Sequence, residues 1–391
     1  MHVAINAQLV SFSASYRNAG VSRYTYLLVD GLAHHESDQR YSVFVTAQDA
    51  ASAGHFETPR LRLVPSKWPT AYPAQRILWE QLALPATLRR RHVDVFHSPV
   101  NVLPLRLTCP SVVTIHDLAF LSYPQFFRPA RRVYQRALTT RSARRATLVL
   151  ADSESTKQDI VARLGVPSSR VRVVYPAIDP KFRPMPDPHR LAAFRQEHDL
   201  PERFLLYLGT LEPRKNLVGL IEAYAALRSQ EVTAPPLVIA GGKGWYYDAL
   251  FAKVRELNLE RAVTFAGYVR DEEQALWYAA AELFIYPSLF EGFGLPVAEA
   301  MACGTPVVTS NASSLPEVAG NAAILADPRQ PVALAHAMQS VLASDETRRR
   351  LAAEGPLWVR RFSVERLITG CTEVYDEAAS HVARRHAVEV G

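Results

Sequence analysis

The sequence predicts an α/β protein with two doubly wound domains, each built on a parallel sheet between layers of helices. Short apolar runs of strand character alternate with helical stretches along most of the chain, as they do in parallel sheets covered on both faces. The length of 391 residues also exceeds what one hydrophobic core usually organises, roughly 250 to 300 residues. A proline-rich stretch at 175–188 interrupts the alternation and is typical of a domain linker.

The first series of elements lies before this linker. Strands are expected at the short apolar runs 3–7, 41–46, 61–64, 93–97, 111–115, 147–151 and 171–174. Helices are expected between several of them, at 21–34, 74–91, 126–145 and 154–164. Ser153 can cap the last helix, and Glu154 and Asp159 favour its N-terminal half.

The second series follows the linker, with helices between its strands. Its strands are expected at 204–209, 237–240, 262–266, 282–286, 306–309 and 322–325. The tail at 363–383 has a helical pattern and is expected to cross back to the first domain. The predicted domains are therefore 1–183 together with 370–391, and 184–369. They should face a cleft, because ligands of doubly wound sheets bind beyond the carboxyl ends of the strands.

Composition excludes several classes of protein. Apolar residues make up 48% and charged residues 21%, as in a soluble globular protein. The three cysteines lack metal-ligand spacing, so free thiols in a reducing compartment are predicted. No apolar run reaches the roughly 20 residues that span a bilayer, and a strand begins at the N-terminus where a signal peptide would stand. These features predict a cytoplasmic protein.

The charge is unevenly distributed. Residues 1–185 have 24 Lys+Arg against 12 Asp+Glu, whereas residues 186–391 have 20 against 26. Most of the excess lies at 89–91 and 128–145. One interpretation is a solvated helix face. The other is a basic surface, rimmed by the aromatic residues of 120–127, that meets anionic lipid or a phosphorylated acceptor. Nucleic acid is not predicted, because no recognition motif accompanies the charge.

The stretch 286–308 is the most informative part of the chain. An apolar strand leads into a turn that contains Gly292 and Gly294, and a helix opens near Pro296. Glu291 lies before the turn and Glu299 lies inside the helix. Amides at a helix N-terminus bind anions and polar oxygens, and glycine permits close approach of a ligand. The stretch therefore predicts a site for a molecule with hydroxyls and a phosphate.

Three further segments contain candidates for the same chemistry. Arg214 and Lys215 follow a buried strand and offer a planar fork and a point charge to a diphosphate, although most such pairs are merely solvated. Gly20 precedes a helix and could bring an amide to a phosphate, or could be a flexible loop residue. His116 stands at the end of a strand, where a catalytic role competes with a structural one.

Together, these motifs resemble the signature of the family-4 retaining glycosyltransferases with the GT-B fold. The resemblance is dense across 200–330 and thinner before it. It is carried by the glutamate pair with its glycine turn and by the segments 209–216, 239–245, 267–269 and 114–117. It implies a GT-B fold, an enzyme that transfers a sugar, and a nucleotide-sugar donor.

The resemblance also implies a role for each matching residue. The predicted catalytic residues are His116, Arg214, Lys215 and Glu291. The predicted donor-binding residues are Gly20, Gly209, Gly241, Lys243, Tyr268, Val269, Phe293, Gly294, Leu295 and Glu299. In this scheme Glu291 and the turn amides bind the sugar, and Glu299 binds the ribose. Arg214, Lys215 and the Gly20 amide bind the diphosphate, while His116 faces the sugar and the reacting centre. The segments 241–243 and 268–269 line the nucleotide and base pocket.

The chemistry of such a transfer agrees with these residue types. A nucleoside diphosphate is a good leaving group, and Arg and Lys can neutralise its charge in place of a metal. The chain has no Asp-x-Asp motif, so no metal and no other cofactor are predicted. One departure is that the phosphate loop of the first domain has a single clear glycine, Gly20, where many members of the family have two.

Other functions are less well supported by the sequence. A glycosidase could use two carboxylates, but it needs no phosphate site. A dehydrogenase needs a Gly-x-Gly-x-x-Gly turn, which no strand here precedes. A non-catalytic sugar-nucleotide-binding protein should have lost the charged residues.

The donor and the acceptor are predicted from the particular residues of the motifs. These residues resemble the corresponding motifs of bacterial mannosyltransferases of polysaccharide or lipopolysaccharide synthesis, which implies GDP-mannose as donor and a glycan or lipid-diphosphate-linked acceptor. A UDP-sugar-dependent glucosyl-, galactosyl- or rhamnosyltransferase is the alternative. The basic first domain predicts that the protein is peripheral on the inner face of the cell membrane.

Overall fold

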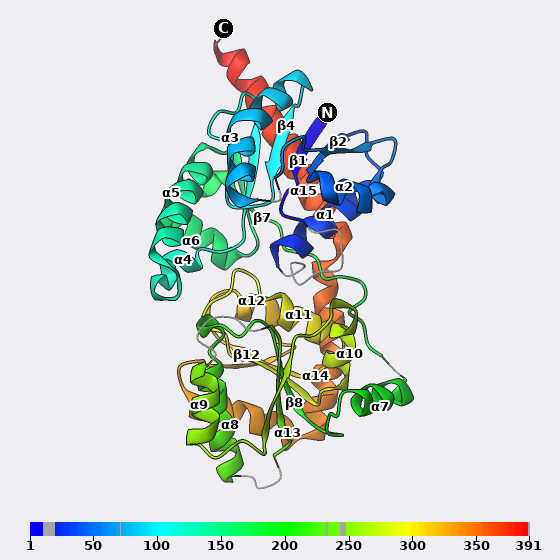
Figure 1. Ribbon diagram of the computed structural model, residues 1–391, viewed down its shortest axis with the longest axis vertical. Helices are drawn as coiled ribbons and strands as arrows, with labels where there is room; N and C mark the ends of the chain where they lie inside the picture. Colours follow the sequence, from blue (N-terminus) through cyan, green and yellow to red (C-terminus); the bar gives the residue numbers. More distant parts are fainter. Residues whose placement is uncertain (11–19, 71, 186, 231–233, 243–247, 390–391) are drawn as a thin grey trace. The chain divides into compact units, whose positions relative to one another are not determined.

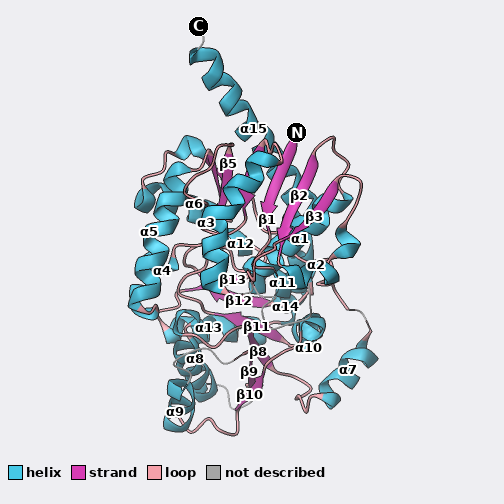
Figure 2. Ribbon diagram, turned by 45° about the horizontal axis from the view of Figure 1, so that its top comes forward, coloured by secondary structure: helices cyan, strands magenta, loops and turns pink. Residues whose placement is uncertain are grey.

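The computed structural model describes residues 1–10, 20–70, 72–185, 187–230, 234–242 and 248–389. They form two compact units, one made of Met1–Ala177 with Phe362–Gly391 and the other of Ile178–Arg361. Each unit has one parallel sheet flanked by helices (Figure 1). The alternation of strand and helix that the sequence predicts is visible in both units (Figure 2).

The sheet of the first unit has the strand order β3-β2-β1-β4-β5-β6-β7, with every pairing parallel. Its strands are β1 (His2–Asn6), β2 (Arg40–Val45), β3 (Leu61–Pro65), β4 (Val95–Ser98), β5 (Ser111–Ile115), β6 (Leu148–Ala151) and β7 (Val171–Val173). All residues of β4, β5 and β6 are buried, because helices cover both faces of the sheet. The predicted strands are confirmed, with ends that differ by one or two residues.

Two apolar layers cover the faces of this sheet. The helices of the unit are α1 (Val21–His34), α2 (Ala47–Ser52), α3 (Pro73–Arg90), α4 (Ala119–Ser122), α5 (Pro129–Arg145), α6 (Glu154–Leu164) and α15 (Val364–Glu389). Side chains of α1 and α15 share one cluster with alternate strand residues. Those of α3, α5 and α6 share the other. Ser153 caps α6 as predicted, since its hydroxyl accepts a hydrogen bond from the Thr156 amide.

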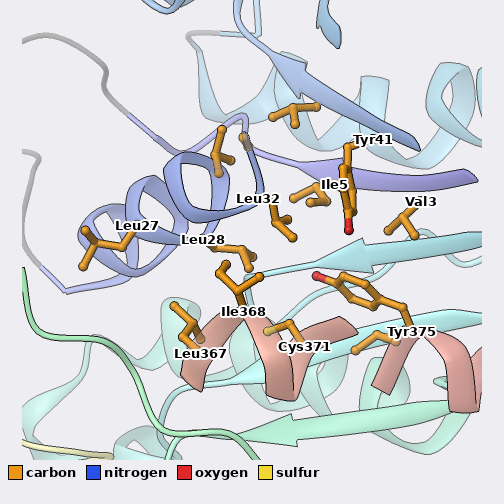
Figure 3. Packing of buried hydrophobic residues seen from close by; sticks show 14 of the residues in the cluster. Val3, Ile5, Leu27, Leu28, Leu32, Tyr41, Leu367, Ile368, Cys371 and Tyr375 are labelled. Carbon is orange, nitrogen blue, oxygen red and sulfur yellow. The ribbon is translucent and has the colours of Figure 1, made fainter. Parts of the chain in front are cut away.

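The C-terminal helix α15 returns to the first unit. Ile368 and Tyr375 of α15 point into the cluster that contains Leu28 of α1 and Ile5 of β1 (Figure 3). At Gly31 of α1, an added Cβ would lie only 2.6 Å from the Ile368 side chain, so glycine permits this close packing of the two helices. The prediction that the tail crosses back is confirmed.

The sheet of the second unit has the order β10-β9-β8-β11-β12-β13, again with every pairing parallel. Its strands are β8 (Leu205–Leu208), β9 (Leu237–Ala240), β10 (Val263–Gly267), β11 (Leu283–Tyr286), β12 (Val307–Ser310) and β13 (Ile324–Ala326). In this order, the loops after β10, β9, β8, β11 and β12 lie side by side along one edge of the sheet. The predicted site residues of this unit fall on four of these loops and on the helix that follows β11.

Eight helices of the described part of the chain cover this sheet. They are α7 (Pro188–Glu197), α8 (Leu217–Gln230), α9 (Asp248–Glu256), α10 (Gln274–Ala280), α11 (Leu295–Ala302), α12 (Leu315–Ala319), α13 (Pro331–Leu342) and α14 (Asp345–Trp358). Helix α8 packs against α9 and α13, while α11 packs against α10, α12 and α14. None of the described helices is long and apolar enough to cross a bilayer.

The unit boundaries differ somewhat from the domain boundaries predicted at 183/184 and 369/370. Residues 178–183 belong to the second unit, because Phe182 packs edge-on against Tyr278 of α10 and Lys181 is paired with Asp271. At the other end, the first unit takes in the whole of α15, because that helix runs without interruption from Val364.

Candidate functional site

The turn between β11 and α11 holds Glu291 in a buried position. Its backbone amide donates a hydrogen bond to the Ser313 hydroxyl at 2.9 Å, and its carbonyl accepts one from the Ser314 hydroxyl at 3.0 Å. The Ser314 hydroxyl also donates to the Phe293 carbonyl at 2.7 Å. Both serines lie in the loop after β12, the strand next to β11, so the neighbouring loop fixes the shape of the turn.

The Glu291 carboxylate binds both cations that the sequence predicts for the diphosphate. Arg214 Nη1 donates to Oε2 at 2.9 Å, and Lys215 Nζ donates to Oε1 at 2.6 Å. These residues come from a short 3₁₀ turn, Pro213–Lys215, that follows β8. Strands β8 and β11 are hydrogen-bonded neighbours, and the structure therefore brings Arg214, Lys215 and Glu291 into one cluster.

Further partners hold each member of the cluster in place. The Ser288 and Tyr286 hydroxyls donate to Glu291 Oε1 at 2.6 and 3.1 Å. Lys215 Nζ also donates to the Tyr286 hydroxyl at 2.7 Å. Arg214 donates to the Phe290 carbonyl at 2.6 Å. Its other terminal nitrogen donates to Glu212 at 2.8 Å.

The electrostatics of the cluster fix its charge states. Burial on its own raises the pKa of Glu291, but the charges of Arg214 and Lys215 and the hydrogen bonds outweigh it and lower the pKa to about 2. Burial and the neighbouring Arg214 lower the pKa of Lys215, and the two glutamates act in the opposite direction. Glu291 is thus a fixed anion at neutral pH, which is the state that accepts hydrogen bonds and cannot supply a proton.

Helix α11 begins where the sequence predicts. Gly294 precedes it with a φ of 111°, a left-handed conformation that favours glycine, and Pro296 lies in the first turn. Phe293 and Gly294 are buried and Leu295 is half-buried. Glu299 lies inside α11 and is 3% exposed; Tyr278 of α10 donates a hydrogen bond to its carboxylate at 3.0 Å. The two glutamates therefore lie on separate parts of the same strand–turn–helix segment.

The loops after β8, β9 and β10 contain the other predicted donor contacts. Gly241 has a φ of 138°, and an added Cβ would lie only 1.9 Å from the Gly209 carbonyl. The backbones of Gly209 and Gly241 are therefore so close together that position 241 has no room for a side chain. Tyr268 follows β10 and is 57% exposed, whereas Val269 is buried. Lys243 lies outside the described residues.

The remaining predicted residues, Gly20 and His116, lie in the first unit. Gly20 precedes α1 with a φ of 57°. His116 follows β5, and its ring meets the ring of Tyr24 in the first turn of α1 edge-on, at 5.0 Å between centroids. Since Tyr24 donates its amide to the Gly20 carbonyl at 3.0 Å, both predicted residues lie at the same edge of this sheet.

The His116 ring is bound on both sides. Nδ1 lies 2.7 Å from Asp152 Oδ2, and Nε2 lies 2.8 Å from the Pro99 carbonyl. Burial lowers the pKa of His116, but the charge and hydrogen bond of Asp152 and the Pro99 carbonyl outweigh it, so that the pKa is raised. Asp152 is not among the residues that the sequence predicts for the site. It directly follows the buried strand β6, the same signal that identified His116 after β5.

Several other residues of the site were also missed. They are Glu212, Tyr278, Tyr286, Ser288, Ser313 and Ser314, all of which hold predicted residues in place. Within the described part of the chain, no group of three or more His, Cys, Asp or Glu residues is arranged to hold a metal ion. All three cysteines are free thiols, as predicted.

Comparison with known proteins bears on this combination of fold and site. The family model "Glycosyl transferases group 1" matches residues 190–358, and "Glycosyltransferase Family 4" matches residues 18–182. The O-antigen chain mannosyltransferase B of Escherichia coli is 33% identical over 373 residues, which cover 92% of this chain and 96% of that protein. The chain belongs to the family-4 glycosyltransferases.

Solved structures agree with the fold of this family-4 glycosyltransferase. Sucrose-phosphate synthase from Thermosynechococcus elongatus superimposes with a TM-score of 0.76 at 23% identity, over 97% of this chain and 99% of that one. Anabaena Alr3699/HepE, solved in complex with UDP-glucose, superimposes with a TM-score of 0.73 at 20% identity, over 96% and 100%. The predicted GT-B class, with two doubly wound units, is confirmed.

Proposed function

We propose that this glycosyltransferase moves mannose from GDP-mannose to a growing glycan of a bacterial polysaccharide or lipopolysaccharide, with retention of anomeric configuration. The acceptor in this proposal is a lipid-diphosphate-linked oligosaccharide. The similarity to an O-antigen mannosyltransferase over nearly the whole of both chains supports mannose. The observation that carries the proposal is the cluster in which Arg214 and Lys215 clamp the Glu291 carboxylate at the carboxyl edge of the second sheet.

The cluster suits a donor that has both hydroxyls and a diphosphate. Arg214 and Lys215 supply two cations at one short turn, enough to neutralise the charge that develops as the nucleoside diphosphate leaves. Because these cations can act in place of a divalent ion, we propose that the transfer needs no metal and no other cofactor. Glu291, fixed as an anion, accepts hydrogen bonds from sugar hydroxyls, and Glu299 is the acceptor for the ribose.

The donor is tested by a panel of nucleotides. We expect GDP and GDP-mannose to raise the midpoint of thermal unfolding in a concentration-dependent manner, because a ligand that binds only the folded state stabilises it. UDP and UDP-glucose at the same concentrations should have little effect. Stabilisation by UDP without stabilisation by GDP would indicate that the donor is a UDP-sugar and not GDP-mannose. No stabilisation by any nucleotide would leave a protein without a donor site and contradict the proposal.

A surface on the first unit supports a position at the membrane. Helix α5 contains no acidic residue, and four of its six arginines, Arg136, Arg141, Arg144 and Arg145, line an open hollow of about 370 Å³. Large apolar side chains are also exposed on this helix and in the α3 segment: Val133 and Tyr134 on α5, Leu78 and Leu82 on α3, and Tyr72 just before α3. Helices α3 and α5 pack on the same face of the sheet. Exposed apolar side chains beside arginines suit the interface of an anionic bilayer.

Vesicle binding tests this surface. We expect the protein to sediment with phosphatidylglycerol vesicles and to stay in solution with phosphatidylcholine vesicles. The double reversal Arg136→Glu with Arg141→Glu should weaken binding by about tenfold or more, since each basic residue near an anionic surface contributes about 1 kcal/mol. Arg255→Glu with Arg261→Glu, a matched reversal of two exposed arginines in the second unit, serves as the control. Equal binding of the two double variants to phosphatidylglycerol vesicles would contradict a position at the membrane.

A further inference from the structure

The surroundings of His116 are built by three neighbouring strands. Strands β4, β5 and β6 lie side by side in this order, and each is followed at once by one partner of the contact: Pro99, His116 and Asp152. The His116 amide donates to Asn101 at 3.3 Å, which holds its backbone as well. The side chain of His116 is only 14% exposed and that of Asp152 only 7%.

Both nitrogens of the ring face groups that accept hydrogen bonds. A carbonyl oxygen has no proton to give, and neither has an ionised carboxylate. A neutral imidazole has one N–H and can satisfy only one of the two acceptors, whereas an imidazolium satisfies both. The other titratable groups that face the ring are Tyr24 from α1, His97 from β4 and Asp117 on the same loop. His97 is neutral, because burial lowers its pKa to about 3.

The carboxylate depends on the ring in turn. Asp152 Oδ1 is buried and has no hydrogen-bond partner in the described part of the chain, so the bond from His116 to Oδ2 is the compensation that the structure provides for this buried charge. Removing one member of such a pair leaves the other charge uncompensated. Each of the two side chains is therefore the partner that the other needs in this buried position.

We propose that Asp152 is the positioning residue of the transfer reaction, holding His116 as an imidazolium that acts through its charge and cannot serve as a general base. This inference rests on the proposed function and on the sequence prediction that His116 faces the sugar and the reacting centre. Both ring nitrogens already donate, so the ring has no lone pair with which to take a proton. In such a role the imidazolium acts by stabilising negative charge that develops during the transfer.

The first test separates charge from position. In Asp152→Asn, the amide can still hydrogen-bond Nδ1 of a neutral ring, so the ring stays in place without the carboxylate. We expect the pH above which kcat/KM for transfer declines to fall by about one to three units, the usual effect of an opposite charge in contact. Asp117→Asn removes a carboxylate that has no hydrogen bond to the ring, and the oxygen of its amide can still accept from the Ala119 amide. The shift in this control should be smaller.

The second test does not depend on catalysis. Ring nitrogen resonances of His116, assigned with His116→Gln, should show a doubly protonated ring at pH 7 in the wild type and a neutral ring in Asp152→Asn. If the Asp152→Asn variant fails to fold, the wild-type spectrum is sufficient to test the inference. A neutral His116 in the wild type at pH 7, or the same titration in both proteins, overturns the inference. Loss of the proposed function is a different result: no sugar transfer by the wild type, with the imidazolium still present.

Discussion

The Lys215→Ala protein is expected to lose about 10² to 10³-fold in kcat/KM for sugar transfer, which is the usual cost of removing one preorganised electrostatic contact. Lys215 is a buried amine with two short hydrogen bonds, to Glu291 and to the Tyr286 hydroxyl. Once it is removed, the cluster loses an ammonium that can meet the diphosphate, and Arg214 is the cationic partner of Glu291 that remains among the described residues. Steady-state transfer from GDP-mannose gives the measurement, with circular dichroism to establish that the variant is folded.

Lys253→Ala is the matched control for this prediction. Lys253 lies on α9 and pairs with Glu222 and Glu256 at 3.3 and 3.0 Å, and surface pairs of this kind contribute little to stability. We expect wild-type kinetics from this protein. If Lys215→Ala transferred sugar as fast as Lys253→Ala, the diphosphate could not depend on the cluster.

Replacement of Glu291 by Gln is expected to lower the free energy of unfolding by about 3 to 5 kcal/mol at pH 7, because it leaves the buried Lys215 ammonium without its carboxylate partner. Lys215 is 8% exposed and Glu291 is 7% exposed, so water cannot replace the lost partner. The double variant Lys215→Met with Glu291→Gln should recover part of the loss, since it removes one uncompensated charge with the carboxylate. Urea unfolding of the three proteins gives the comparison.

The same variant has a defined pH dependence. Glu291 has a pKa of about 2 in the folded protein, lowered from an ordinary value of 4.5. A depressed carboxyl pKa contributes stability that is fully present above the ordinary value and disappears as the pH falls through the folded value. The difference in unfolding free energy between wild type and Glu291→Gln should therefore stay constant from pH 7 to about pH 5 and shrink below pH 4. A constant difference down to pH 3 would contradict the ion-pair cluster.

Much of the architecture could be predicted because parallel sheets leave a strong periodic signal. Apolar strands such as Ser111–Ile115 are buried along their whole length, and a buried strand followed by polar residues marks the carboxyl edge of a sheet. That signal alone identified Arg214, Lys215 and His116 as candidates. The turn at Glu291 could be predicted for a related reason, because Gly294 and Pro296 have conformational preferences that fix the start of α11.

The partners of these residues could not be predicted, because they depend on which strands are neighbours. Ser313 reaches the Glu291 amide only because β12 lies beside β11, and Asp152 reaches His116 only because β6 lies beside β5. One sequence does not reveal strand order. The boundary between the two units could not be predicted for a different reason. The prolines of the linker indicate a connection between domains, but the packing of Phe182 on Tyr278 determines where the second unit begins.

Calorimetric titration of GDP into the wild type, Lys215→Ala and Lys253→Ala proteins tests the donor grip formed by Arg214, Lys215 and Glu291 most directly. We expect the wild type and Lys253→Ala to bind GDP with the same affinity. Lys215→Ala should bind at least about tenfold more weakly, since a charge-assisted hydrogen bond to phosphate contributes roughly 1.5 to 3 kcal/mol. Equal affinity in all three proteins would show that the cluster does not hold the diphosphate.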